Sequence, residues 1–338
     1  MSVSTSRNLI TDVAGLSVGN AHDATLRSGV TVLLCDEPMT TAVDVRGGGT
    51  GTREVMALHP EGTVQQVHAL TLAGGSAFGL DAATGVQSFL REHGRGFPIG
   101  DALVPIVPQA ILFDLLNGGD KNWGRRPPYQ DLAYAACETA GAEFALGTAG
   151  AGYGATTCNL KGGLGSASAQ AQSGITVGAL AAVNAVGSVA IGDGPHFWSA
   201  PFESRSEFGG LGMPTELPPN ALQPRIKGGP QENTTLVVVA TDARLDRMML
   251  RRLAIMAQTG FARAIYPVHT PLDGDIVFAV STGARALPDP IYGLTELGTL
   301  AANVTARAIA RGVYEATAFN DAPTGLPAYK DCFEVPQK

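Results

Sequence analysis

The sequence predicts a layered α/β protein. Short runs rich in β-branched residues alternate with segments that carry apolar residues at helical spacing, and such alternation is typical of layered sheets and helices. The chain of 338 residues is 45% hydrophobic and only 16% charged, so it can bury a large core. Its 43 glycines and 21 prolines are scattered among apolar segments, which indicates a globular protein with many tight turns.

The predicted elements follow one another along the whole chain. Strands are expected at 30–34, at 42–45, within 175–191, at 234–241 and at 276–281. Helices are expected at 76–90, from a cap at 242 to a terminating glycine at 260, and at about 296–314. The strand 234–241 is apolar at nearly every position, which is typical of a strand that is buried on both faces.

Residues 196–233 form the longest predicted loop. The segment contains six prolines and several glycines, and it shows neither the helical nor the strand periodicity. A structureless loop of this length inside a compact protein usually has a function or is cut. It ends directly at the buried strand 234–241.

Charge and hydropathy exclude two classes of partner. The net charge of -7, without any cluster of Lys and Arg, argues against nucleic acid, because binding a polyphosphate requires clustered positive charge. No run approaches the roughly 18 apolar residues of a membrane span, and the N-terminus shows no secretory pattern. We therefore expect a cytoplasmic protein that does not bind membranes.

Metal and cofactor sites are not indicated. The four cysteines lie far apart without a C-x-x-C pair, and the six histidines show no metal-binding spacing. Residues 150–154 are rich in glycine, but no helical pattern and no acidic residue about 20 positions further on completes a dinucleotide-binding motif. A tight turn near an active site or an interface is favoured there, with Tyr153 as a candidate pocket residue.

Thr234 marks the border between the long loop and the buried strand, and Asn233 precedes it. A threonine hydroxyl can attack the carbonyl before it and shift the acyl group from nitrogen to oxygen, giving an ester that water opens. The freed α-amine, with an ordinary pKa of about 7.7 to 8.0, can then serve as the general base. This junction predicts a cleavage site between Asn233 and Thr234, with Thr234 as the nucleophile. The alternatives are an ordinary strand start and an unused glycosylation motif.

Four polar residues are candidates for supporting roles. Asp273 and Asp275 flank a glycine just before a predicted strand, where carboxylates can orient and tune the amine of Thr234. A plain β-turn is the alternative. Asn184 and Lys161 lie between apolar runs and can donate hydrogen bonds to a developing oxyanion. The alternative for Asn184 is a core asparagine with ordinary hydrogen bonds, and the alternative for Lys161 is a solvated turn lysine.

These segments, taken in order, resemble the family of L-aminopeptidase/D-esterase-amidases, self-processing N-terminal-nucleophile hydrolases. That family includes β-peptidyl aminopeptidases, a pantetheine hydrolase and the endohydrolases of nylon (6-aminohexanoate) oligomers. The resemblance covers nearly the whole chain. It rests on GLSVG (15–19), DVRGG (44–48), LAGGSAFGL (72–80), GAG (150–152), KGGLG (161–165), Asn184, NTT (233–235) and HTPLDGD (269–275).

The resemblance implies a fold and a set of roles. The fold is an αββα sandwich, a single catalytic domain over 1–338 that is processed into an α-chain of 1–233 and a β-chain of 234–338, with αβ units in a homotetramer. Thr234 is implied as nucleophile and base, Asn184 as oxyanion donor and Lys161 as a neighbour of the nucleophile. Asp273 and Asp275 are implied as the acidic pair that contacts the nucleophile. No cofactor is required.

One departure from the family concerns the substrate. Aminopeptidase members place an acidic residue and a tyrosine two positions apart to hold a free substrate amine, whereas this chain has Ile111 and Phe113. Both are therefore candidate pocket residues, and Asp114 lies close enough to compensate. Selection for a free amino terminus is not predicted.

The predicted function is hydrolysis of a small peptide-like or ω-amino-acid oligomer amide through an acyl-enzyme on Thr234. Two alternatives remain from other classes. One is an acyltransferase, because ornithine acetyltransferases resemble this fold and also use a processed threonine. The other is an uncut binding protein that holds a ligand with the glycine-rich segments and the loop 196–233.

Overall fold

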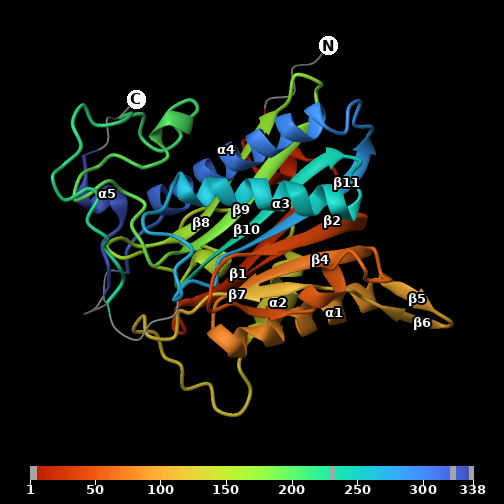
Figure 1. Ribbon diagram of the computed structural model, residues 1–338. Coiled ribbons are helices and arrows are strands. Elements are labelled where there is room, and N and C mark those ends of the chain that lie inside the picture. The colour runs from red at the N-terminus through yellow and green to blue at the C-terminus, as the bar shows by residue number, and fades with distance from the viewer. Residues whose placement is uncertain (1–5, 229–232, 320–324, 335–338) are drawn as a thin grey trace.

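The computed structural model describes residues 6–228, 233–319 and 325–334. Within them, nine strands form one hydrogen-bonded sheet, and two more form a hairpin that projects from one side of the molecule (Figure 1). The sheet contains β1 (Leu16–Asp23), β2 (Ser28–Val45), β3 (Gly51–Arg53), β4 (Gln66–Ala73), β7 (Gln109–Ile111), β8 (Gly163–Gln170), β9 (Thr176–Asn184), β10 (Thr234–Ala243) and β11 (Ile276–Arg285). The hairpin contains β5 (Phe97–Ile99) and β6 (Ala102–Val104).

The long strand β2 joins two layers of this sheet. Its first half pairs antiparallel with β1 and β4, and its second half pairs antiparallel with β11. The register with β4 shifts between Leu34 and Met39, where the strand passes from one layer to the other. Beyond β11, the order is β10, β9 and β8, with β10 parallel to β11 and antiparallel to β9.

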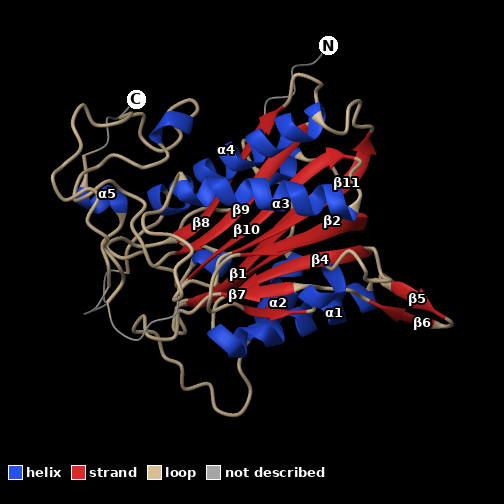
Figure 2. Ribbon diagram, in the orientation of Figure 1, coloured by secondary structure: helices blue, strands red, loops and turns tan. Residues whose placement is uncertain are grey.

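Two pairs of helices cover the outer faces of the sheet layers. The pair α3 (Arg247–Ala262) and α4 (Tyr292–Tyr314) covers β8 to β11, and the pair α1 (Ala82–Glu92) and α2 (Tyr129–Glu138) covers the other layer (Figures 1 and 2). The remaining helical turns are Ile10–Asp12, Val55–Leu58, Ser76–Asp81, Gly150–Gly152, Ala200–Phe202 and α5 (Tyr329–Cys332). None of the helices in the described part of the chain combines the length and apolarity needed to cross a bilayer.

Three hydrophobic cores separate the four layers. On β10, Leu236 belongs to the core between the two sheet layers, and Val237 belongs to the core beneath α3 and α4. On β2, Leu33 belongs to the same inter-sheet core, and Val32 belongs to the core over α1 and α2. The layer order is therefore helix, sheet, sheet, helix, which confirms the predicted αββα sandwich and the burial of β10 on both faces.

Several predicted element boundaries were wrong. The two strands expected at 30–34 and 42–45 are halves of β2, and the helix expected at 76–90 begins only at Ala82, after a 3-10 turn. Helix α3 is capped by the side chain of Asp246, which accepts from Met249 N, and it runs through Gly260 to Ala262. Gly260 serves packing, because an added Cβ would lie 2.4 Å from the Ala302 carbonyl oxygen of α4.

A buried ionic cluster fastens the loop after β9 to helix α4 and the N-terminal segment. Glu207 forms ion pairs with Arg307 and, at 3.7 Å, with Arg311. Arg307 also donates to Asn8 Oδ1 at 2.7 Å, and Arg311 donates to the Asn8 carbonyl at 2.6 Å. Burial lowers the pKa of Arg311, and Glu207 opposes that shift. We call Asn8, Glu207, Arg307 and Arg311 the ionic clasp.

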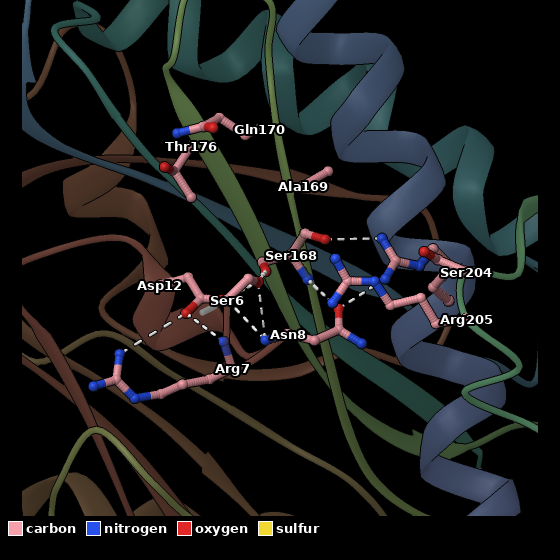
Figure 3. A pocket seen from close by; sticks show the side chains of 11 residues that line it. Ser6, Arg7, Asn8, Asp12, Ser168, Ala169, Gln170, Thr176, Ser204 and Arg205 are labelled. Atoms are coloured by element: carbon pink, nitrogen blue, oxygen red, sulfur yellow. Dashed lines mark hydrogen bonds and ion pairs between the residues drawn. The ribbon is translucent and has the colours of Figure 1, made fainter. Parts of the chain in front are cut away.

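A cavity of about 400 Å³ lies beside the ionic clasp, among Ser6, Asp12, Ser168 and Thr176. Figure 3 shows the hydrogen bonds that join its walls: Asp12 accepts from Ser168 Oγ at 2.6 Å and from the backbone N–H of Arg7 at 3.0 Å. These polar groups satisfy one another. The cavity lies at the Thr176 end of β9, about 26 Å from the Asn184 end at ~3.3 Å per residue.

Removal of the clasp carboxylate should destabilise the protein. Glu207→Ala leaves Arg307 and Arg311 largely buried, with side chains 8% and 13% exposed, and without their carboxylate. We expect a loss of about 3–5 kcal/mol in the free energy of unfolding, measured by guanidinium denaturation. The control Glu216→Ala removes an exposed glutamate of the same loop and should change it by less than about 0.5 kcal/mol. Equal effects of the two substitutions would contradict a structural role for the clasp.

Candidate active site

Thr234 is the first residue of β10, an interior strand of the sheet between β11 and β9. It pairs in register with Asn184, the last residue of β9, and it is 2% exposed. Its hydroxyl Oγ1 donates to the carbonyl oxygen of Asn233 at 2.6 Å. The predicted nucleophile therefore lies directly against the carbonyl group of the predicted scissile bond.

The Asn233 carbonyl has a second donor. Gly274 N donates to it at 2.7 Å, and Asn233 N donates to the Leu272 carbonyl at 3.0 Å. A bridge pairs Asn233 in parallel with Asp273. The peptide bond between Asn233 and Thr234 is thus held along the turn before β11, and a backbone N–H polarises its carbonyl group.

This close approach requires glycine at 274. A Cβ added to Gly274 would lie 2.4 Å from Thr234 Oγ1 and 2.8 Å from the Gly49 carbonyl oxygen. The glycine-rich segment after β2 supports the turn from outside, because Gly47 N and Gly49 N donate to the carbonyls of Asp275 and Asp273 at 3.1 and 2.8 Å. Two of the sequence segments that carry the family resemblance, 44–48 and 269–275, therefore meet beside Thr234.

The two aspartates hold the backbone around Thr234. Asp275 Oδ1 accepts from Thr235 N at 2.9 Å, and its Oδ2 lies 2.9 Å from His269 Nδ1. Asp273 accepts from Thr270 N at 2.8 Å and from Val186 N at 3.3 Å. Burial and the neighbouring Asp275 raise the pKa of Asp273. His269 lies within the HTPLDGD motif but was not among the predicted site residues.

Asn184 has an amide orientation that its neighbours determine. Its Oδ1 accepts from Thr156 N at 3.0 Å and from Lys227 Nζ at 3.1 Å, whereas its Nδ2 donates to the Phe113 carbonyl at 3.0 Å. A side-chain amide nitrogen carries two hydrogens, so one remains for another acceptor. Asn184 is 1% exposed and lies across the strand pair from Thr234.

Lys161 is buried in the structure and is not the solvated turn lysine of the alternative interpretation. It is 2% exposed, and its Nζ donates to the carbonyls of Gly152, Ala155 and Gly162 at 3.3, 2.8 and 3.0 Å. Burial lowers the pKa of Lys161 to about 7, and Asp114 opposes that shift. Its hydrogen bonds within the described residues thus hold the glycine-rich turn near the site and do not reach Thr234.

Lys227 was missed by the sequence analysis. Its Nζ donates to the Thr156 carbonyl at 3.1 Å as well as to Asn184, and burial lowers its pKa to about 7. It lines a cavity of about 220 Å³. Nothing in its local sequence distinguishes it from a solvated loop lysine. The other lining residues are Phe113, Asp114, Leu116, Asn117, Gly154, Thr156, Cys158, Gly228 and Leu326.

The three predicted pocket residues lie in different places. Phe113 lines this cavity, whereas Ile111 on β7 is 5% exposed and belongs to the core over α1 and α2. Tyr153 stacks on His22, with ring centroids 4.1 Å apart. Asp114 lines the cavity but accepts from Ser28 Oγ at 2.6 Å and from a backbone N–H at 2.7 Å, and burial raises its pKa.

The described residues contain no group of three or more His, Cys, Asp and Glu side chains placed to hold a metal ion. The polar groups around Thr234 include its own hydroxyl, the Asn184 amide, the Asp273 and Asp275 carboxylates and backbone N–H groups, and the amine of Lys227 contacts Asn184. They can orient a nucleophile and stabilise an oxyanion, which is the chemistry of acyl transfer.

Solved structures share this fold. The L-aminopeptidase D-Ala-esterase/amidase of Ochrobactrum anthropi, described as a variant of the N-terminal-nucleophile (Ntn) hydrolase fold, superposes with a TM-score of 0.70 at 20% identity, over 97% of this chain and 92% of that one. A β-aminopeptidase of a Burkholderia species gives 0.69 at 20% identity, over 98% and 95% of the two chains. The fold is therefore that of Ntn hydrolases.

The chain belongs to peptidase family S58, whose model matches residues 8–324. An uncharacterized aminopeptidase of Mycobacterium tuberculosis is 44% identical, with 96% of this chain and 98% of that protein covered. A 6-aminohexanoate-oligomer endohydrolase of a Kocuria species is 30% identical, with 87% and 80% covered. The protein is a hydrolase of peptide or amide bonds, which excludes a purely ligand-binding role.

An alanine at 274 tests the geometry around Thr234. We expect Gly274→Ala to displace the hydroxyl and to lower the hydrolysis rate of an amide that the wild-type enzyme cleaves by about 100-fold, because a misplacement of about 1 Å has that effect. The control is Gly141→Ala, where the nearest atom to an added Cβ is 3.8 Å away. Wild-type rates in Gly274→Ala would show that this contact does not constrain the nucleophile.

Proposed function

We propose that the chain cuts its own backbone between Asn233 and Thr234 and then uses Thr234 as an N-terminal nucleophile on small peptide-like or ω-amino-acid oligomer amides. The observation that supports this most strongly is the 2.6 Å hydrogen bond from Thr234 Oγ1 to the Asn233 carbonyl. The N–H of Gly274, 2.7 Å from the same oxygen, is placed to stabilise the negative charge that attack would create there.

Self-cleavage proceeds in two balanced steps. Thr234 Oγ1 attacks the Asn233 carbonyl carbon, the peptide C–N bond breaks, and the hydroxyl proton ends on the departing nitrogen, which leaves an ester. Water then hydrolyses the ester, so that Asn233 ends in a carboxylate and Thr234 begins a new chain with a free amine. Asp273 and Asp275 keep the turn around this bond in place through their backbone hydrogen bonds.

The same hydroxyl then serves the substrate. The neutral α-amine of Thr234 takes the proton from Oγ1, which attacks the substrate carbonyl. The free hydrogen of Asn184 Nδ2 and backbone N–H groups stabilise the oxyanion, and the substrate amine leaves with a proton. Water releases the acyl group from the ester and regenerates Thr234.

The cavity beside Asn184 supports a small, partly apolar substrate. Phe113, Leu116 and Leu326 supply apolar walls in a volume of about 220 Å³. Each oxygen of the Asp114 carboxylate already accepts one hydrogen bond, and burial raises the pKa of this group, which disfavours the charged form that would pair with a free substrate amine. The relative from Kocuria is an oligomer endohydrolase by name, and an endo-acting enzyme has no need of a free terminus.

Assembly of αβ units into a homotetramer stays a prediction.

Self-cleavage can be tested by mass spectrometry of the purified protein. We expect two chains, 1–233 and 234–338, and a single uncut and inactive chain for Thr234→Val, which removes the hydroxyl at nearly constant shape. The matched control is Thr235→Val, because Thr235 is equally buried and its Oγ1 has no hydrogen-bond partner among the described residues. Cleavage in Thr234→Val would exclude the Thr234 hydroxyl as the attacking group, and a wild-type chain that stays intact on prolonged incubation would exclude self-cleavage.

The substrate preference can be tested with matched pairs of amides that carry either a free or a blocked amino terminus. We expect the processed enzyme to hydrolyse both members of a pair at rates within about tenfold, because Asp114 is the only carboxylate among the described residues that line the cavity and burial raises its pKa. A loss of more than about 1000-fold on blocking would instead indicate an obligate aminopeptidase.

Addition of an amine acceptor distinguishes hydrolysis from acyl transfer, since a transferase would form the new amide in preference to the acid.

A further inference from the structure

Lys227 lies in an unusual environment for a lysine. The residue is 8% exposed, and the described residues offer its ammonium group no carboxylate within ion-pair distance. Its two hydrogen bonds go to the Thr156 carbonyl and to Asn184 Oδ1, both at 3.1 Å. A buried amine is costly for the folded state unless it is paired, so this lysine is a candidate for a role beyond packing.

The backbone of Lys227 is anchored next to the nucleophile. Lys227 N donates to the Val186 carbonyl at 3.0 Å, and Val186 N in turn donates to Asp273 Oδ1 at 3.3 Å. The side chain is therefore fixed at its base by the segment that follows β9. Its Nζ reaches back to Asn184, at the end of that strand and opposite Thr234.

The hydrogen bond from Lys227 is one of three contacts that set which way the Asn184 amide faces. An asparagine side chain can rotate by 180° and exchange its oxygen and nitrogen positions, so its orientation depends on the neighbouring donors and acceptors. Lys227 Nζ and Thr156 N are both donors and lie on one side, and the Phe113 carbonyl is an acceptor on the other. A charged donor strengthens this arrangement and polarises the amide, which makes the Nδ2–H a better donor.

We propose that Lys227 is a positioning residue for turnover, which holds the Asn184 amide with Nδ2 available to the oxyanion of the substrate. This inference rests on the proposed role of Asn184 in hydrolysis. Lys227 acts through Asn184. Its direct partners do not include the Asn233 carbonyl, whose described donors are Thr234 Oγ1 and Gly274 N. Self-cleavage should therefore continue without Lys227, while substrate hydrolysis should slow.

The kinetic test compares Lys227→Met with the wild type, with kcat referred to the amount of processed 234–338 chain. We expect kcat to fall about 10- to 100-fold, with KM changed less than about threefold. This loss in kcat is smaller than the roughly 100- to 1000-fold loss that follows removal of an oxyanion donor itself. The matched control is Lys121→Met. Lys121 is a half-buried lysine that also bonds a carbonyl and an asparagine oxygen, Asn117 Oδ1 at 3.0 Å, and this variant should keep its kcat.

A double-mutant cycle tests whether Lys227 acts through Asn184. We expect Asn184→Ala and the double variant with Lys227→Met to have the same kcat within about twofold. Independent, multiplied losses would overturn the proposal. So would a wild-type kcat in Lys227→Met, an equal loss in Lys121→Met, or failure of Lys227→Met to self-cleave.

A crystal structure of Lys227→Met gives a readout that does not depend on activity. We expect the Asn184 amide to turn or to lose its hydrogen bond to the Phe113 carbonyl, and unchanged contacts of Asn184 would overturn the proposal. Cleavage of Thr234→Val would defeat the proposed function itself. A fully active Lys227→Met with an uncut Thr234→Val would defeat only the inference about Lys227.

Discussion

The site depends on the pairing of β10 between β9 and β11. This pairing fixes the start of β10 in three directions: Asn184 faces Thr234 across the antiparallel pair, the Asp273–Asp275 turn precedes the parallel neighbour, and Asp275 accepts from Thr235 N. Because β10 is buried on both faces, a shift of one residue in its register would turn Leu236 and its neighbours into the wrong core. Hydrophobic packing along the strand therefore positions a hydroxyl at its end.

The sequence supports the class of fold and the nucleophile better than the details around them. The apolar run that begins at Thr234 is visible without alignment, and the ordered motifs connect it with Asn184 and the two aspartates. Lys227 could not be predicted, because its role arises from a contact with Asn184, 43 positions away in the chain. Gly260 was misassigned as a helix end because its close approach to α4 is a tertiary effect that local pattern does not encode.

The buried lysines Lys161 and Lys227 also show that local sequence does not predict which tertiary contacts a side chain makes. From the sequence, Lys161 is a candidate beside the nucleophile and Lys227 is an unremarked loop residue. In the structure, Lys161 donates its described hydrogen bonds to backbone carbonyls, whereas Lys227 donates to the side chain of Asn184, which lies opposite Thr234. Burial lowers the pKa of both to about 7, so a shifted pKa alone does not separate a structural lysine from one with a role in turnover.

The position of the proposed cut within the sheet has a consequence for the order of events during synthesis. The strands β10 and β11 come after the cut, yet they lie between β2 and β9, which come before it. Either piece alone would present open strand edges and half of a core to the solvent, and such edges invite aggregation. We therefore expect the proposed cut to follow folding, because the intact chain brings β10 and β11 between β2 and β9 as one covalent unit. Two pieces made separately would lack that covalent connection.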